Sequence, residues 1–147
     1  MKLWDQLMED QKKAMKAKEK LRLSVIRSLR SELKNAEIAN KGELTKEEAL
    51  SILQREIKRR KEALADYKKA NRPSLLKDLE EEIEILNSYL PPQLSEEEIE
   101  EMAREAIKQT GVSSKQDMGK VMGALMPKVK GKADGSLVKK CVEDLLE

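Results

Sequence analysis

The sequence predicts an all-α protein, with an N-terminal helical bundle joined to a compact C-terminal three-helix module. Charged residues make up 39% of the 147 residues and aromatic residues only 2%, with no Phe. The core must therefore be built from aliphatic side chains, which favour helices over sheets. Apolar residues recur at helical spacing, and no segment alternates as a strand does. Two adjacent prolines, Pro91 and Pro92, stop one helix just before another begins.

The proline pair marks a boundary between two regions. Ser95 and Glu98 follow it at the spacing of a capping box, in which each side chain satisfies a free backbone N–H of the other residue. One helix must end near residue 90, and the next must begin near residue 95. We therefore predict an N-terminal helical domain over residues 1–90 and a C-terminal module over residues 95–147.

Four amphipathic helices are expected in the first region, over about residues 3–15, 20–40, 45–70 and 74–89. Asn40-Lys41-Gly42 is typical of a helix end and turn. Thr45 and Glu48 form a second capping box, which begins the third helix. Pro73 is expected to enforce the break before the fourth helix.

Three further helices are expected in the second region. Gly111 is a candidate C-cap for the first of them. A serine, Ser113 or Ser114, is expected to cap the second helix, which should run up to Pro127. After a loop, Asp134 is expected to cap the last helix.

Composition weighs against several functional classes. The chain has no histidine, so the commonest general base and the commonest transition-metal ligand are both missing. We expect no metal, no cofactor and no catalytic residues, although enzymatic activity stays open. Its single cysteine excludes an internal disulfide, and no apolar run resembles a signal peptide or a membrane span. We therefore predict a cytoplasmic protein that does not bind membranes.

A group of lysines near the C-terminus is the best candidate for a binding surface. Residues 111–141 hold seven lysines against two acids, Asp117 and Asp134. Six of them are the candidate phosphate-binding residues: Lys120, Lys128, Lys130, Lys132, Lys139 and Lys140. They surround a Gly-rich loop and the start of the last helix, where free N–H groups and a partial positive charge can hold phosphates. The alternative interpretation is that these lysines only keep a small module soluble.

Other conspicuous residues have plain structural explanations. Asp134 is expected to cap a helix and not to act in catalysis, and Cys141 is expected to lie in the core. Gly119 and Gly123, four residues apart, are expected to let another helix pack closely. Four methionines are expected to fill the core, although they could line a groove: Met102, Met118, Met122 and Met126. An acidic run is expected to be a solvated face paired with basic helices, not a metal site: Glu80, Glu81, Glu82 and Glu84.

Five stretches stand in a distinctive order and spacing. They are Arg72-Pro73, Leu79-Glu80-Glu81-Glu82-Ile83-Glu84-Ile85-Leu86, Tyr89-Leu90-Pro91, Met118-Gly119-Lys120-Val121-Met122 and Gly131-Lys132-Ala133-Asp134-Gly135. Together they resemble the GatB/YqeY family over nearly the whole chain, and the length suits its free-standing YqeY-like members. The resemblance implies a helical bundle joined to a compact three-helix module.

The resemblance also implies a function. In the amidotransferase that converts misacylated Glu-tRNA or Asp-tRNA to the amidated form, a similar region forms the tail of the B subunit and contacts tRNA. Related domains are appended to some glutaminyl-tRNA synthetases. We therefore expect a non-catalytic tRNA-binding accessory protein, with tRNA and a protein of an aminoacyl-tRNA pathway as partners. A protein-interaction adaptor is the alternative. A component of a carbon–nitrogen ligase with glutamine as amido donor ranks last, because nothing resembles the catalytic cradle of that subunit.

Overall fold

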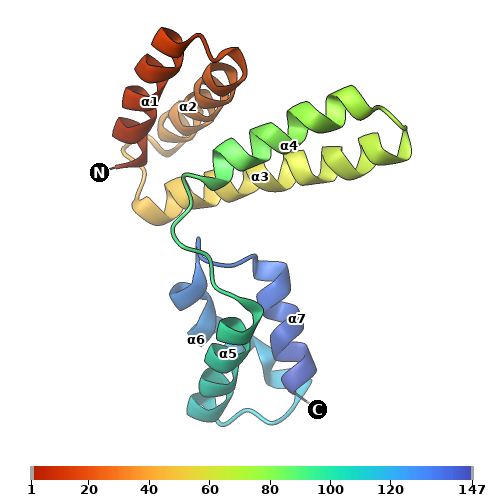
Figure 1. Ribbon diagram of the computed structural model, residues 1–147. Helices are drawn as coiled ribbons and strands as arrows, with labels where there is room; N and C mark the ends of the chain where they lie inside the picture. The colour runs from red at the N-terminus through yellow and green to blue at the C-terminus, as the bar shows by residue number, and fades with distance from the viewer. Residues whose placement is uncertain (1, 147) are drawn as a thin grey trace. The chain divides into compact units, whose positions relative to one another are not determined.

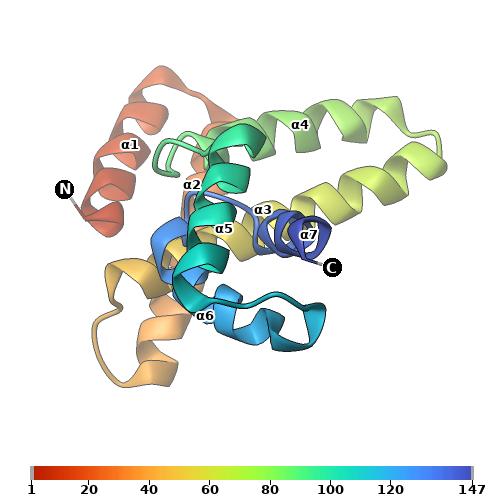
Figure 2. The ribbon, with the colours of Figure 1, turned by 90° about the horizontal axis from the view of Figure 1, so that it is seen from below.

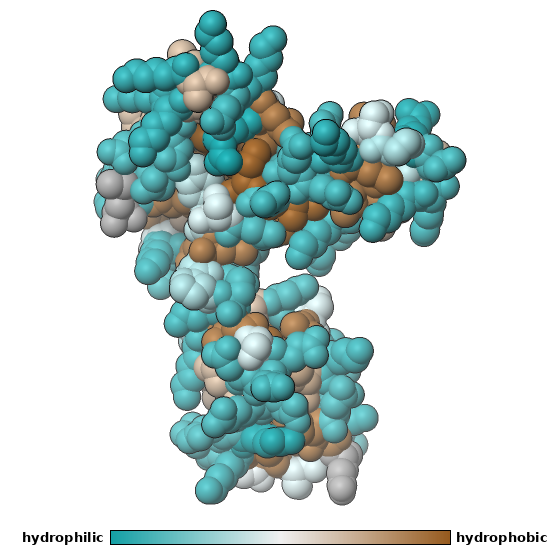
Figure 3. All heavy atoms as spheres, in the orientation of Figure 1, coloured by the Kyte–Doolittle hydropathy of each residue, from teal (hydrophilic) through white to brown (hydrophobic). Residues whose placement is uncertain are grey.

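The computed structural model describes residues 2–146. Within this range the chain forms seven α-helices and one short 3-10 helix, with no strand (Figure 1). The chain divides into two compact units, Met1–Leu90 and Pro91–Glu147. Hydrophilic side chains cover most of the visible face of each unit (Figure 3). The predicted fold class, an all-α chain with an N-terminal bundle and a C-terminal three-helix module, is confirmed.

The first unit consists of four helices, α1 (Leu3–Ala17), α2 (Lys20–Asn40), α3 (Lys46–Lys69) and α4 (Pro73–Asn87). α1 packs on α2, and α3 packs on α4 along a long hairpin that Figure 2 shows from below; α2 also contacts both α3 and α4. The centre consists of aliphatic side chains with almost no exposed surface: Leu7, Val25, Ile26, Leu29, Leu53 and Leu86.

Left-handed residues end three of these helices, and none of them is glycine. Lys18, Lys41 and Asn71 have φ values of 58°, 55° and 54°. The expected break after residue 40 is present, but Lys41 and not Gly42 adopts the left-handed conformation. The expected break before the fourth helix is present, and Arg72, the residue before Pro73, has a non-helical backbone with φ −116° and ψ 79°. Pro73 itself is the first residue of α4, where its missing N–H removes no intrahelical hydrogen bond.

A buried carboxylate ties α3 to α4. Glu56 is only 6% exposed, and it accepts hydrogen bonds from Arg59 and Arg60, both at 3.1 Å. Arg60 also pairs with Glu82 of α4, with 3.3 Å between its Nε and a carboxylate oxygen. Because a buried charge is stable only when it is paired, these side chains specify how the two helices meet. Within the predicted acidic run, Glu82 pairs with a basic helix as expected.

Tyr89, two residues before Pro91, is tied to α1. Its hydroxyl donates a hydrogen bond of 2.6 Å to Asp10, and Gln6 donates a second one to the same carboxylate. Burial raises the pKa of Tyr89 well above its ordinary value, and the neighbouring Asp10 carboxylate raises it further. Both disfavour the negatively charged phenolate.

The Tyr89–Asp10 contact predicts how stability changes at alkaline pH. A raised folded-state pKa means that this contribution to stability is present below about pH 10 and is lost as the pH rises beyond the ordinary tyrosine value. Tyr67→Phe leaves Tyr89 as the only tyrosine of the chain. In this variant, tyrosinate absorbance should appear only well above pH ~10, followed by ultraviolet spectroscopy. Titration of the folded variant near pH ~10 would contradict the contact.

Tyr89→Phe tests the same contact at neutral pH. Loss of a hydrogen bond to a charged acceptor should lower the free energy of unfolding by about 1.5–3 kcal/mol, measured by chemical denaturation. An unchanged free energy of unfolding would mean that the hydroxyl gains as much from water as from Asp10.

The second unit contains α5 (Glu96–Thr110), the 3-10 helix η1 (Lys115–Asp117), α6 (Met118–Val129) and α7 (Gly135–Leu145). The predicted capping box is present at the start of α5, where Ser95 and Glu98 bond to each other's backbone N–H. Gly111 ends this helix with φ 69°, as expected. The core of the second unit joins all three α-helices, and its buried residues include Ile99, Ala103, Val121, Leu125, Val129, Val138 and Val142.

The predicted beginning and end of α6 are both wrong. Ser114 makes no side-chain cap, because η1 precedes α6 and the N–H of Asp117 bonds to the backbone carbonyl of Ser114. The helix also continues two residues past Pro127. Pro127 lacks the N–H that would bond to the carbonyl of Gly123, but Gly123 is exposed and water can take that place.

Candidate nucleic-acid interface

The turn after α6 carries two of the predicted lysines. Lys130 has φ −58° and ψ 126°, Gly131 has φ 79°, and the N–H of Lys132 donates to the carbonyl of Val129 over 2.8 Å. These values define a type II turn, whose third position favours glycine because it requires positive φ. Gly131 is also buried.

The segment that follows the proline pair holds this turn in place. The N–H of Leu94 donates to the carbonyl of Lys132 over 2.8 Å, and the amide of the Gln93 side chain donates to the carbonyl of Gly131 over 2.9 Å. The two carbonyls of the turn are thus satisfied within the unit. The Lys130 and Lys132 side chains project from a fixed backbone, and both are exposed.

Asp134 is the N-cap of α7, as predicted. Its carboxylate accepts a hydrogen bond of 3.0 Å from the N–H of Ser136. The cap occupies one of the free N–H groups of the helix and places a negative charge beside the others. The α7 N-terminus is therefore a poor site for the phosphate that was expected there, and lysine side chains must supply the attraction.

All six predicted lysines are exposed, and none forms an ion pair with another residue of the described range: Lys120, Lys128, Lys130, Lys132, Lys139 and Lys140. The structure gathers Lys128, Lys130 and Lys132 at the last turn of α6 and the type II turn. Lys120 lies apart, about 12 Å earlier along α6. We define the lysine turn as Lys128, Lys130 and Lys132.

The two lysines of α7 are less favourable for binding an anion. Lys139 and Lys140 lie on its second turn, and each is followed four residues later by an acid, Glu143 or Asp144. Residues four apart on a helix are neighbours, so these acids reduce the local positive charge. The lysine turn is the strongest part of the candidate interface.

Cys141 is not set up as a nucleophile. The side chain is partly buried against the core, as predicted. Burial raises the pKa of the Cys141 thiol, and the carboxylates of Glu100, Glu96 and Asp144 raise it further. Each effect disfavours the reactive thiolate. The four methionines of this unit also pack against its core, as expected.

The prediction that Gly119 and Gly123 allow close helix packing is wrong. Both residues are exposed, and a Cβ atom built on either of them would meet no atom within 4 Å. Sequence spacing alone misled here, because it shows that the glycines share one side of α6 but not which side faces the core.

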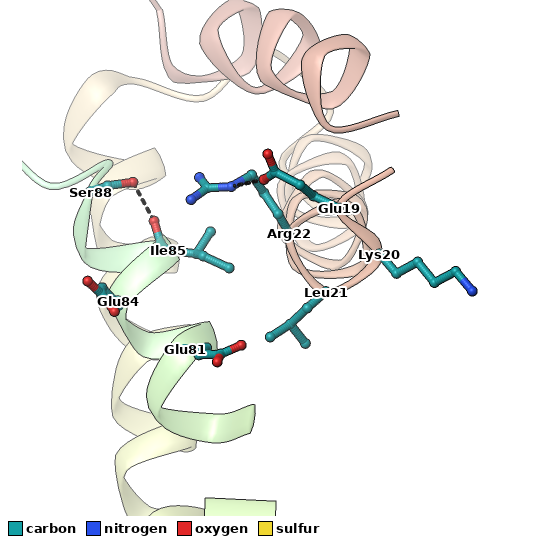
Figure 4. Close-up of a pocket in the computed structure, with 8 residues that line it drawn as sticks. All are labelled: Glu19, Lys20, Leu21, Arg22, Glu81, Glu84, Ile85 and Ser88. Carbon is teal, nitrogen blue, oxygen red and sulfur yellow. Dashed lines mark hydrogen bonds and ion pairs between the residues drawn. The ribbon is translucent and has the colours of Figure 1, made fainter. Parts of the chain in front are cut away.

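A pocket of about 520 Å³ in the first unit was not foreseen from the sequence (Figure 4). The start of α2 and the second half of α4 line it, with Leu21 and Ile85 as its apolar residues. Glu81 and Leu21 point toward one another across it. Its formation requires two helices about sixty residues apart to pack, which no local pattern predicts. The Ser88 hydroxyl at the edge of the pocket donates to the Ile85 carbonyl over 2.5 Å and not to a carboxylate.

Because Gly123 of α6 is exposed, its replacement by a larger residue should be tolerated. Gly123→Ala should raise the free energy of unfolding by about 0.5–1 kcal/mol, because alanine is the better helix former and its methyl group meets no neighbour. Gly131→Ala is the contrasting variant and should be destabilising, since φ 79° suits only glycine. Chemical denaturation of both variants measures the two effects. Destabilisation by Gly123→Ala would show that a neighbouring group lies against this side of α6.

The Asp134 cap gives a second prediction. Asp134→Ala should lower the free energy of unfolding by about 0.5–2 kcal/mol, whereas Asp134→Asn or Asp134→Ser should have little effect because both side chains can still accept from the Ser136 N–H. Thermal and chemical denaturation provide the measurement. Equal losses for alanine and serine would point to a role of the carboxylate beyond capping.

Comparison with known proteins identifies a family and several relatives. Residues 4–146 match the family described as Yqey-like protein. A protein of Pyrenophora tritici-repentis named Altered inheritance of mitochondria protein 41, mitochondrial, is 30% identical over 144 residues, which cover 95% of this chain and 78% of the relative. The protein of the same name from Lachancea thermotolerans is 42% identical over 97 residues, 64% of this chain and 52% of the relative.

The names of these relatives contain the word mitochondrial. A cytoplasmic location stays a prediction for this chain. No helix within residues 2–146 combines the length and the apolar character needed to cross a membrane. Since the family match spans nearly every residue, the resemblance noted in the sequence is confirmed, and the chain belongs to the family of YqeY-like proteins.

Proposed function

We propose that this chain is a non-catalytic tRNA-binding accessory protein, and that its lysine turn contacts backbone phosphates. The observation that supports this most is that three neighbouring lysines, Lys128 on the last turn of α6 and Lys130 and Lys132 on the type II turn, are exposed and form no ion pair within residues 2–146. Internal hydrogen bonds hold the type II turn in place. Lysines that stabilise the fold would be paired or partly buried, and these are neither.

The proposed mode of recognition is by charge and shape. Lysine is a flexible point charge, which suits phosphate contacts better than the reading of base edges. Trp4, Tyr67 and Tyr89 are the only aromatic residues, and all precede the second unit. This unit therefore has no ring on which an unpaired base could stack. A folded RNA with closely spaced phosphates is the ligand that fits.

Catalysis is assigned to other proteins in this proposal. The chain has no histidine, and its one thiol has a raised pKa. A family-level activity as a carbon–nitrogen ligase with glutamine as amido donor would thus require a partner that supplies the reacting groups. The proposed role is to hold tRNA for a protein of an aminoacyl-tRNA pathway in the cytoplasm.

Replacement of the lysine turn tests the proposal. The triple variant Lys128→Gln, Lys130→Gln, Lys132→Gln should bind folded tRNA more weakly than the unaltered chain. If each lysine neutralises one phosphate, the slope of log affinity against log salt should fall by about 2 to 3 in magnitude. Thermal stability should be nearly unchanged, because exposed lysines contribute little to folding. Filter binding over a series of salt concentrations measures the slope.

A matched control removes the same charge elsewhere. Lys58, Lys61 and Lys68 are exposed residues of α3, and their triple glutamine variant should keep most of the affinity and slope. Equal weakening by both variants would mean that net charge alone drives binding. If the unaltered chain bound no tRNA near physiological salt, the adaptor hypothesis would replace this one.

A further inference from the structure

One side of α1 carries four residues at coiled-coil spacing, and no described helix of this unit fully covers them. Trp4, Met8, Gln11 and Met15 follow one another at intervals of four, three and four residues, so they form a single stripe along the helix. Two members of this stripe, Met8 and Met15, are 39% and 52% exposed. We call these four residues the α1 seam.

Arg30 of α2 lies on the seam and lacks an anionic partner. Its guanidinium is 4.6 Å from the centre of the Trp4 ring, and its Nη1 donates to the side chain of Gln11. Its Nε is buried without a hydrogen-bond partner within the described residues. No carboxylate of that range forms an ion pair with Arg30. A half-buried guanidinium with an unused donor is incomplete, because such cations are normally paired with an acid.

The residues that border the seam are also mainly basic. Lys12 lies one turn after Met8 on α1, and Arg27 and Lys34 lie one turn before and after Arg30 on α2. All three are exposed, and only Lys34 has a carboxylate within reach, 3.7 Å away on Glu37. Two acids, Asp5 and Glu9, directly follow seam residues on α1, so the surplus of positive charge comes mainly from α2. The surface thus combines exposed methionines with a surplus of positive charge.

We propose that the α1 seam is a docking site for an acidic amphipathic helix of a partner protein. Apolar residues of that helix at spacings of three and four would lie on Met8 and Met15, whose flexible side chains adapt to different shapes. A flanking carboxylate would pair with Arg30, and others would face Lys12 and Arg27. Two such α1 seams would instead bring Arg30 against Arg30, so charge disfavours a second copy of this chain as the occupant.

The proposed partner differs from RNA in what it satisfies. RNA phosphates could pair with the cations, but they would leave the two exposed methionines without an apolar contact. An acidic amphipathic helix would pair with the cations and would also cover the two methionines. This site also lies in the first unit, whereas the lysine turn lies in the second, so each can fail without the other.

The seam contains its own reporters. Trp4 is the only tryptophan of the chain, so its fluorescence reports on Arg30 directly. The probe is a synthetic peptide of about three heptads, with Leu at the two apolar positions and Glu at the flanking ones. Its binding should change Trp4 emission. It should also shift the methyl NMR signals of Met8 and Met15, while those of Met102, Met118, Met122 and Met126 stay in place.

Variants separate the proposal from nonspecific attraction. Met15→Glu changes an exposed side chain, so it should fold normally and weaken peptide binding at least about tenfold. Arg30→Gln should weaken it similarly, and its fold can be checked by circular dichroism. The matched control Leu75→Glu alters an exposed apolar residue of α4 and should leave the affinity within about twofold. Both seam variants should retain tRNA binding, and the lysine-turn variant should retain peptide binding.

Three outcomes would overturn the proposal. The first is that the acidic peptide produces no change in Trp4 or in the two methionines. The second is that a peptide with Lys in place of Glu binds equally well, because the attraction would then be apolar only. The third is that folded tRNA or phosphatidylserine vesicles, and not the peptide, shift Met8 and Met15. This result would assign the seam to RNA or to a lipid surface.

Discussion

The candidate RNA interface depends on the backbone hydrogen bond from Leu94 to Lys132. This bond exists because Pro91 and Pro92 prevent a helix from continuing through the joint, so the N–H of Leu94 is free for a distant acceptor. The acceptor is available because Gly131 adopts φ 79° and turns the chain directly after α6. Because this hydrogen bond helps to fix the backbone of the turn, the lysine side chains can move without lowering the stability of the unit. The position of the lysine turn thus follows from two prolines and one glycine.

Local chemistry was enough to predict most of the fold. The capping boxes at Thr45 and Ser95, the Gly111 C-cap and the Asp134 N-cap each involve groups within a few residues, and all four are present. Such contacts depend little on the tertiary structure, because both partners lie within a few residues of each other. The errors at Ser114 and Pro127 have a different origin. At Ser114 a 3-10 turn takes up the backbone groups that a cap would satisfy, and at Pro127 the carbonyl of Gly123 that loses its partner belongs to an exposed residue.

The sites were less predictable, because they depend on which side of a helix faces the core. Gly119 and Gly123 share one side of α6, yet that side is exposed. The contact of Arg30 with Trp4 joins residues 26 positions apart, and no local pattern indicates it. For the lysines, the composition predicted an exposed basic group. The sequence also indicated the loop of Lys128, Lys130 and Lys132 as the first part to test, and the structure adds the type II turn and the hydrogen bonds that hold it.

Unpaired charge is the property that the two proposed sites share, but burial makes their chemistry different. The exposed lysines are hydrated when free, so they gain from an anion mainly through the release of counterions, and salt weakens that gain. Arg30 is half-buried and has already lost part of its hydration. A carboxylate that reaches Arg30 fills an unused donor and displaces little bound water. High salt screens such a buried pair much less than an exposed one. Binding at the lysine turn should therefore be rapid and strongly dependent on salt, whereas binding at the α1 seam should be selective for shape and should persist at higher ionic strength. A protein that must release its RNA while it stays attached to a partner would need this difference between two basic surfaces.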